Sequence, residues 1–303
     1  MTAEPMRDRF ARVATELLDT DPRVALVLAD IGTDRFRATG AIERHPDRVI
    51  NVGIREQLMV STAGGLALEG FRAIAHSYAP FLVERSFEQV KLDFVHQGVG
   101  GILVSVGASY DWTMGGRTHH APEDVALLST LPGWTIHVPG HPDEAEAALR
   151  AAVAGDDGVY IRLSDRSNRA AHPVNRVTVI RRGSRSAPTV LVVGPMLDAA
   201  ETALDGLDVT LLYTPTVRPL DADGLRAEVT GDSLAIVEPY LQGTSLPTLS
   251  GVFSDRPMRY LSVGVPNAEH RRYGSPRQHD AAFGLDAPGL RERLAAWLEA
   301  VPA

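Results

Sequence analysis

Short apolar runs rich in β-branched residues alternate with longer stretches of helical periodicity along most of the chain. In the first half, the short runs occupy residues 24–30, 49–52, 72–77, 101–107, 134–139 and 159–163. Segments in which apolar residues recur every three or four positions precede or separate them, at residues 7–18, 56–69, 81–95, 122–131 and 142–154. Buried strands that alternate with helices are typical of a parallel sheet covered on both faces.

A second alternation follows a change in composition. Residues 164–187 are rich in Arg, Ser and Asn and lack long apolar runs. Strand-like runs then resume at 189–194, 209–213, 234–238 and 258–263, with helical segments at 197–204, after Gly243 and at 289–300. We therefore predict an α/β fold of two doubly wound domains, residues 1–165 and 188–303, joined by a linker at 166–187. The length of 303 residues favours two domains over one.

Charge and cysteine content narrow the function classes. Thirty Lys and Arg against 38 Asp and Glu give a net charge of −8, without a basic run, which argues against nucleic-acid or anionic-membrane binding. The absence of cysteine excludes disulfides, thiolate nucleophiles and Cys-based metal sites. The chain shows neither an apolar signal core nor a run of about 20 apolar residues. These observations favour a cytoplasmic protein that acts on small molecules.

Candidate functional groups follow the predicted strands, and parallel sheets bind ligands at the carboxyl ends of their strands. Asp30 ends the first strand, Glu56 begins a helix, and Tyr78 and Phe81 follow the third strand. A glutamate at a helix start also simply stabilises the helix dipole, so Glu56 alone is ambiguous. The glycine-punctuated loop 107–120 is more suggestive of function, because it carries Tyr110, Trp112, Arg117, His119 and His120.

Several familiar catalytic and nucleotide-binding motifs are absent. The sequence has no GxxxxGK[ST] phosphate loop, no GxGxxG after a strand, no GxSxG and no HExxH. His119 and His120 are adjacent, which is a poor arrangement for two ligands on one helix face. We therefore predict no metal site within this chain.

Four segments together resemble the C-terminal section of transketolases. They are NVGIREQ at 51–57, MVSTAGGLALEG at 59–70, HSYAPFLVERSFEQV at 76–90 and GGRTHHAPEDVA at 115–126. Further along, PLD at 219–221, IVE at 236–238 and the closing helix resemble the small C-terminal domain of that family. The resemblance covers nearly the whole chain and is weaker in the second half.

This resemblance implies an enzyme that depends on thiamine diphosphate, with this chain supplying the pyrimidine-binding domain. The Gly-Asp-Gly motif and downstream Asn with which the family holds the diphosphate and Mg²⁺ have no counterpart here. The chain therefore resembles one subunit of a split transketolase, which needs an N-terminal-type partner for the diphosphate and Mg²⁺. By resemblance we expect an α2β2 heterotetramer that transfers a two-carbon ketol or related acyl unit from a ketose or 2-oxo donor to an aldehyde-type acceptor.

The resemblance also assigns roles to individual residues. Glu56 matches the glutamate that hydrogen-bonds the aminopyrimidine ring of the coenzyme, so that the coenzyme can ionise itself. Tyr78 and Phe81 match the aromatic residues that flank this ring, and Asp30 matches an acidic residue near the coenzyme. His119 matches a histidine that contacts the substrate oxygen. We thus predict Glu56 and His119 as the catalytic residues.

Acceptor recognition departs from the pattern of sugar-phosphate transketolases. Gly115 stands where those enzymes carry a hydroxyl-binding aspartate, Gly107 lies near the position of a phosphate-binding histidine, and Arg117 replaces a proline. Candidate substrate contacts besides His119 are His120, Arg117 and Arg162. The donor and the acceptor stay open, as do two alternatives: the β-subunit of a 2-oxoacid dehydrogenase or acyloin-forming enzyme, and a non-catalytic paralogue. The segment at 117–124 followed by a helix favours a transketolase.

Overall fold

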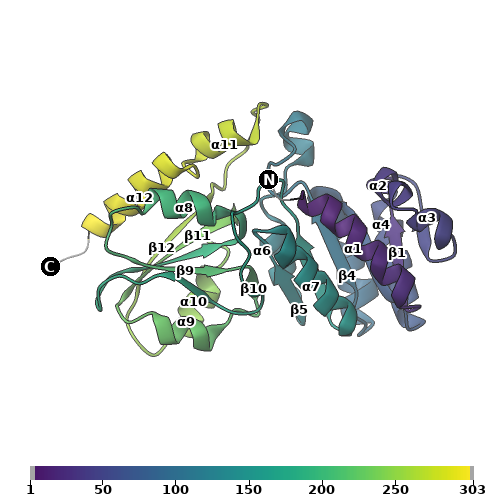
Figure 1. The fold of residues 1–303 in the computed structure, drawn as a ribbon, viewed down its shortest axis with the longest axis horizontal. Coiled ribbons are helices and arrows are strands. Elements are labelled where there is room, and N and C mark those ends of the chain that lie inside the picture. Colours follow the sequence, from purple (N-terminus) through teal and green to yellow (C-terminus); the bar gives the residue numbers. More distant parts are fainter. Residues whose placement is uncertain (1–3, 301–303) are drawn as a thin grey trace.

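A computed structural model describes residues 4–300 as two adjoining α/β units, the first half of the chain on the right of Figure 1 and the second half on the left. The first unit is built on a seven-stranded sheet with the strand order β10-β5-β6-β4-β3-β1-β2. Every pair in it is parallel except the edge pair of β10 and β5. The strands are β1 Val24–Leu28, β2 Val49–Asn51, β3 Arg72–Tyr78, β4 Ile102–Val106, β5 Trp134–His137, β6 Gly158–Arg162 and β10 Thr216–Arg218.

Helices cover both faces of this sheet because successive side chains of a buried strand point to opposite faces. In β1, Leu26 packs into an apolar cluster with Phe10 of α1, whereas Val27 packs into another with Met59 of α4. The helical segments of this unit are α1 Met6–Thr20, α2 Thr33–Ala38, α3 Ala41–Arg44, α4 Glu56–Leu68, η1 Pro80–Glu84, α5 Phe87–Gln89, η2 Val90–His96, η3 Thr113–His119, α6 Asp124–Ser129 and α7 Pro142–Ala154. The helix predicted at 81–95 is thus divided into short turns of different pitch.

The second unit is a five-stranded sheet with the order β12-β11-β8-β9-β7. Leu197 of α8 and Leu294 of α12 pack on one face, while Leu225 of α9 and Leu249 of α10 belong to the apolar cluster of the other face. The strands are β7 Thr178–Arg181, β8 Thr189–Val193, β9 Thr210–Thr214, β11 Ser233–Leu241 and β12 Arg259–Val265. The helices are η4 Gly194–Met196, α8 Leu197–Ala203, α9 Ala222–Glu228, α10 Leu246–Val252, α11 Pro276–Phe283 and α12 Ala287–Glu299.

The predicted fold class, two α/β units with largely parallel sheets, is confirmed. Two strands lie in places that the sequence did not indicate. The predicted linker 166–187 contains β7, which pairs antiparallel with β9 at the edge of the second sheet. The second half of the chain returns β10 to the first sheet, where Thr216 pairs with His137. A short strand at a sheet edge gains its stability from the neighbour it pairs with, so its own sequence carries a weak signal.

Two further properties concern the described residues as a whole. Within residues 4–300, no helix is both long enough and apolar enough to cross a lipid bilayer. In the same part of the chain, no group of three or more His, Asp or Glu side chains is arranged to hold a metal ion. The cytoplasmic location predicted from the sequence stays a prediction.

Candidate active site

Glu56 is a buried carboxylate at the first residue of α4. The short strand β2 ends at Asn51, and the following loop brings the chain into the helix at Glu56, whose side chain is 2% exposed. The free N–H groups and the dipole at a helix start favour a negative charge at this position. Within the chain, Arg85 Nη1 donates a hydrogen bond to Glu56 Oε2 at 2.8 Å. The site therefore begins with a carboxylate that is shielded from water and paired with one cation.

Three aromatic side chains, Tyr78, Phe81 and Trp112, lie together at the end of β3, the next strand along the chain, and form what we call the aromatic wall. Tyr78 is the last residue of this strand, and Phe81 lies in the following turn η1. Their rings meet edge-on with centroids 6.3 Å apart. Trp112, from the loop after β4, stacks on Tyr78 at 5.2 Å with an interplanar angle of 19°. The loop that the sequence singled out thus adds a third ring to the predicted pair.

His119 joins this wall from the end of η3. Its ring lies 4.3 Å from the centroid of Trp112 and 5.1 Å from that of Phe81, edge-on to both. Burial lowers the pKa of His119 and the nearby charge of Arg85 lowers it further, against a hydrogen bond with the backbone of Gly115 that raises it. The imidazole is therefore largely neutral at pH 7, so it is able to accept a proton.

Arg85 connects the carboxylate to the aromatic wall. Besides its bond to Glu56, its guanidinium carbon lies over the ring of Phe81, 4.4 Å from the centroid. The sequence motifs did not single out this residue. The available signal was its spacing of four residues from Phe81 in a helical segment, which brings two side chains onto the same face.

The two glycines that depart from the sugar-phosphate pattern have steric explanations. A Cβ atom at Gly107, whose φ is +74°, would lie 2.5 Å from Cδ1 of Tyr78. A Cβ atom at Gly115 would lie 2.5 Å from Cγ of His119. The rings of the aromatic wall therefore fill the space that a side chain at either position would need.

Asp30 lies at the same edge of the sheet, where it bonds to Asn51 and to neither Glu56 nor the aromatic wall. Its backbone N–H donates to Asn51 Oδ1 at 3.1 Å, and Asn51 Nδ2 donates to Asp30 Oδ1 at 2.9 Å. Asp30 adopts a left-handed backbone with φ of 63°, which aspartate tolerates better than most residues. These bonds join the ends of β1 and β2, and a contact between Asp30 and the coenzyme stays a prediction.

Two predicted substrate contacts, Arg162 and His120, are buried, and their contact with a substrate stays a prediction. Arg162 is 1% exposed, and it donates to Asp124 Oδ2 and to Ser109 Oγ, each at 2.7 Å. The guanidinium of Arg162 is thus enclosed and paired with a carboxylate inside the chain. His120 is also 1% exposed, and its ring lies against that of His279 in α11 at 5.5 Å rather than in the aromatic wall. Burial lowers the pKa of His120 to about 4.

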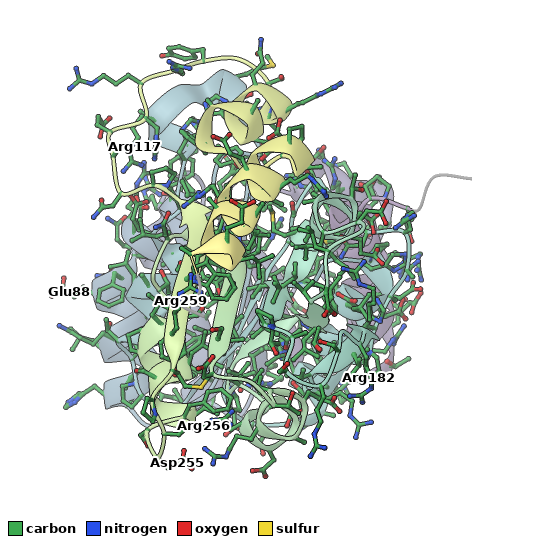
Figure 2. All side chains as sticks on the ribbon, turned by 90° about the vertical axis from the view of Figure 1, so that its left-hand side faces the viewer. Glu88, Arg117, Arg182, Asp255, Arg256 and Arg259 are labelled. Atoms are coloured by element: carbon green, nitrogen blue, oxygen red, sulfur yellow. The ribbon has the colours of Figure 1, made fainter. Side chains whose placement is uncertain are left out.

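Arg117 lies beside the segment that precedes α11, at the edge of the molecule in Figure 2. Its Nη1 donates to the carbonyl of His120 at 2.9 Å, and its Nη2 donates to Glu123 Oε1 at 3.1 Å. Nearby, burial and the charge of Glu123 raise the pKa of Glu84 to about 7, against the charge of Arg117. The charge of Arg117 is thus shared with carboxylates, and its contact with a substrate stays a prediction.

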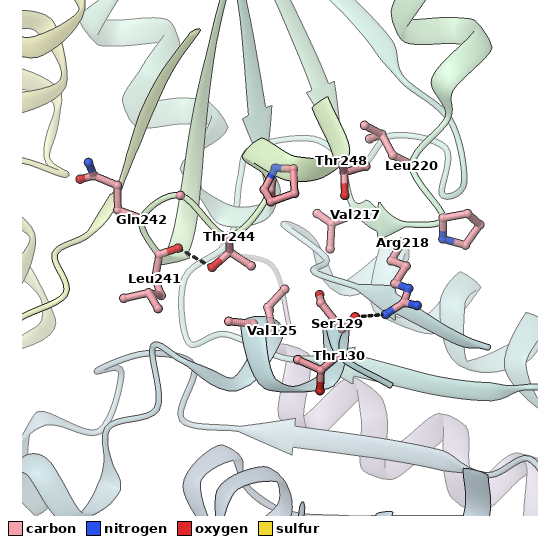
Figure 3. Close-up of a pocket in the computed structure, with 15 residues that line it drawn as sticks. Val125, Ser129, Thr130, Val217, Arg218, Leu220, Leu241, Gln242, Thr244 and Thr248 are labelled. Carbon is pink, nitrogen blue, oxygen red and sulfur yellow. Dashed lines mark hydrogen bonds between the residues drawn. The ribbon is translucent and has the colours of Figure 1, made fainter. Parts of the chain in front are cut away.

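A cavity of about 860 Å³ lies elsewhere, between α6 and the segment around α10 (Figure 3). Apolar and hydroxyl-bearing side chains dominate its lining, and Arg218 supplies its guanidinium. Arg218 Nη1 donates to the carbonyl of Ser129 at 2.5 Å, at the end of α6. Neither Glu56 nor the aromatic wall lines this cavity. Its lining offers no buried acid or base for catalysis, so the strand ends around Glu56 are the better candidate site.

Comparison with known proteins identifies the family of this chain. Residues 4–170 match the family described as transketolase, pyrimidine binding domain. The chain belongs to the transketolase family. The resemblance drawn from the sequence motifs, to the C-terminal section of transketolases as a separate subunit, is confirmed.

Similar proteins extend the match beyond residue 170. The chain is 47% identical to an uncharacterized 33.6 kDa protein in the fasciation locus of Rhodococcoides fascians, over 95% of this chain and 93% of the relative. It is 31% identical to a subunit of the apulose-4-phosphate transketolase of Actinobacillus succinogenes, over 95% of each chain. A solved structure described as a split gene transketolase, inactive β4 tetramer, matches with a TM-score of 0.83 at 21% identity, over 98% of this chain and 99% of that one. This structural likeness supports the fold of both units.

Proposed function

We propose that this chain is the C-terminal subunit of a split, thiamine diphosphate-dependent, transketolase-like enzyme. It transfers a two-carbon ketol or related acyl unit from a ketose or 2-oxo donor to an aldehyde-type acceptor. The observation that carries the proposal is the buried carboxylate of Glu56 beside the aromatic wall of Tyr78, Phe81 and Trp112, with His119 alongside. Membership of the transketolase family, whose pyrimidine-binding domain matches residues 4–170, implies the dependence on thiamine diphosphate.

A partner subunit completes the enzyme in this proposal. The sequence carries no Gly-Asp-Gly motif with a downstream Asn for the diphosphate and Mg²⁺. An N-terminal-type subunit supplies those ligands, and the two chains assemble as an α2β2 heterotetramer. A relative that is itself named as one subunit of a transketolase, and that this chain matches over 95% of both lengths, supports an enzyme divided in this way.

The residues present fit the aminopyrimidine ring of the coenzyme. The guanidinium of Arg85, a planar group with N–H donors, contacts both Glu56 and the ring of Phe81, which shows that one planar donor group can reach both. When bound, thiamine diphosphate supplies the carbanion chemistry that no protein side chain provides. Glu56 would hold the pyrimidine nitrogen by a hydrogen bond, while Tyr78 and Phe81 would orient the ring and exclude water from it.

His119 would accept the proton of the substrate oxygen and return it. Its imidazole is half-buried in the aromatic wall, and its lowered pKa leaves it able to accept a proton at neutral pH. Thr118 Oγ1 lies 2.9 Å from its Nδ1, a contact that orients the ring. Glu56 and His119 thus act on different molecules, the first on the coenzyme and the second on the substrate.

The test is reconstitution with an N-terminal-type transketolase subunit that carries the Gly-Asp-Gly motif. The purified pair is given hydroxypyruvate, a ketose phosphate or pyruvate with an aldehyde acceptor, and consumption of the donor is measured. Glu56→Gln is expected to lower turnover by at least about a hundredfold, because general acid–base groups contribute roughly 10²–10⁴. Glu69→Gln, at an exposed glutamate just after the same helix, is the matched control and is expected to retain full activity.

Each outcome separates the proposal from its alternatives. Consumption of hydroxypyruvate or of the ketose phosphate supports a transketolase. Consumption of pyruvate alone points to a 2-oxoacid dehydrogenase or acyloin-forming enzyme. If the assembled pair consumes no donor and Glu56→Gln changes nothing measurable, the chain is a non-catalytic paralogue and the proposal is wrong.

A further inference from the structure

The guanidinium of Arg85 touches the two groups that the proposed function assigns to the coenzyme ring. It donates to Glu56 Oε2 at 2.8 Å and lies over Phe81 with its central carbon 4.4 Å from the ring centroid. A guanidinium is planar, donates N–H bonds in its own plane and stacks on aromatic faces. An aminopyrimidine ring at this position would make the same two contacts: its N–H groups would donate to Glu56, and its face would stack on Phe81.

The two planar groups exclude one another at this position. His119 and Tyr78 meet Phe81 with interplanar angles of 72° and 81°, so each contacts it edge-on. The guanidinium is the planar group that lies over the Phe81 ring. A ring that stacks on the same face of Phe81 needs a separation of about 3.5–4 Å between carbon atoms, a space that the guanidinium occupies. A ring seated against Glu56 Oε2 and this face of Phe81 therefore displaces Arg85.

The position of Arg85 allows such a displacement. Its side chain is 43% exposed, whereas that of Glu56 is 2% exposed. The long arginine side chain can thus leave toward solvent while the carboxylate stays in place. Within residues 4–300 Arg85 is the cation paired with Glu56, and it occupies Oε2, so it competes with a ligand that binds this oxygen.

We propose that Arg85 is an internal occupant of the pyrimidine position: it holds Glu56 and covers Phe81 in the free subunit, and it swings out when the coenzyme ring enters. The inference rests on the proposed function. Arg85 acts through Glu56 and is therefore a positioning residue. It keeps the buried carboxylate paired before assembly and sets how tightly the ring binds.

The experiment measures binding of a ring that carries no phosphate. The probe is 4-amino-5-hydroxymethyl-2-methylpyrimidine, the neutral ring portion of the coenzyme, titrated into the full chain and followed by ligand-observed NMR. Arg85→Gln and Arg85→Ala are expected to bind it about five- to tenfold more tightly than the unaltered chain, since a single charge-assisted bond is released. Arg85→Lys, which keeps the charge without the planar face, is expected to lie between them and the unaltered chain.

Controls separate a local effect from a change in net charge or in folding. Arg182→Ala removes an exposed arginine that pairs with Glu228 far from the site, and it is expected to leave the affinity unchanged. Glu56→Gln combined with Arg85→Gln is expected to abolish the gain, because the carboxylate that receives the ring is gone. Circular dichroism and thermal melting confirm that each variant is folded.

The outcomes distinguish this inference from the proposed function. Equal affinity of the unaltered chain, Arg85→Gln and Arg85→Ala, with a loss on Glu56→Gln, overturns the role of Arg85 and leaves the pyrimidine site standing. No binding by any folded variant overturns the role of Arg85, and the reconstitution assay then decides the proposed function. Tighter binding by the Arg85 variants that depends on Glu56 supports both.

Discussion

At the scale of single residues, the candidate site depends on which side chains are allowed close to the aromatic wall. Tyr78 lies so close to the backbone at Gly107 that a methyl group there would overlap its ring. In the same way, a methyl group at Gly115 would overlap the ring of His119. The chain therefore cannot carry larger residues at these two positions without moving the rings. Under the proposed function, other groups would have to recognise the acceptor.

This steric account predicts different effects for two glycines of similar backbone geometry. Gly107→Ala combines a positive φ of +74° with a collision against Tyr78, and it is expected to lower the free energy of unfolding by about 2–3 kcal/mol. Gly98→Ala has a φ of +69° but open space around its Cβ, so a loss of about 1 kcal/mol is expected. Urea denaturation measures both. Equal losses would show that the contact with Tyr78 contributes nothing.

At the scale of elements, the loop that carries His119 is supported by the second unit. Thr113 Oγ1 donates to the carbonyl of Gly274, and Tyr110 donates to Asp280 Oδ1 at 2.6 Å in α11. The ring of Tyr273 lies over Gly116, where an added Cβ would be 2.7 Å from it. Figure 1 shows α11 beside the teal loop of the first unit. The second unit therefore helps to hold η3 and, through it, His119.

The support can be removed at Tyr273, whose side chain is 73% exposed. Tyr273→Ala is expected to increase the hydrogen-exchange rate of backbone amides in 113–119 several-fold, because their cover is lost, with little change in the melting temperature. Mass spectrometry of proteolytic fragments measures this exchange. Met114→Ala, an exposed side chain on the same loop, is the control. Unchanged exchange in the Tyr273 variant would show that η3 holds its shape alone.

At the scale of the whole molecule, the two units share one core. A continuous apolar cluster contains Ile136 and Val138 of the first unit together with Leu191 and Tyr240 of the second. The strand β10 adds a backbone connection, because it leaves the second unit to pair with β5. The predicted boundaries at 165 and 188 therefore mark a change along the sequence rather than a gap in the structure. We expect the chain to unfold as a largely cooperative unit.

Stability should also depend on buried histidines in different parts of the molecule. Burial and the charge of Arg7 lower the pKa of His76 to about 3, and burial lowers the pKa of His137 to about 4. With folded values below the unfolded value of about 6.5, these groups stabilise the fold fully above pH 6.5 and lose that contribution as the pH falls toward 3. Glu84, with its raised pKa, acts in the opposite direction between about pH 7 and 4.5.

The contribution of His76 can be isolated by comparison with His76→Gln. The free energy of unfolding of the unaltered chain should fall more steeply below pH 6.5, by at most about 1.4 kcal/mol per pH unit, than that of the variant. Denaturation curves from pH 7 to 4.5 give both slopes. His96→Gln, at the end of η2, is the control for the loss of a histidine elsewhere in the same unit. Parallel curves for the His76 variant and the unaltered chain would contradict the lowered pKa of His76.

The sequence by itself determined the alternation of strands and helices and the placement of Glu56, Tyr78 and Phe81 at strand ends. These features follow from periodicity over a few neighbouring residues and from the common edge at which parallel strands end. The family also follows from the sequence, because four segments match in order and spacing.

The tertiary structure alone decided which polar groups are enclosed and which are available. Arg162 and Asp124 form a buried pair 38 residues apart, and Arg85 reaches Glu56 across 29 residues. Stacking of Trp112 on Tyr78 and the return of β10 to the first sheet also join segments that are remote along the chain. Such contacts depend on how the elements pack, and no local pattern of residues encodes them.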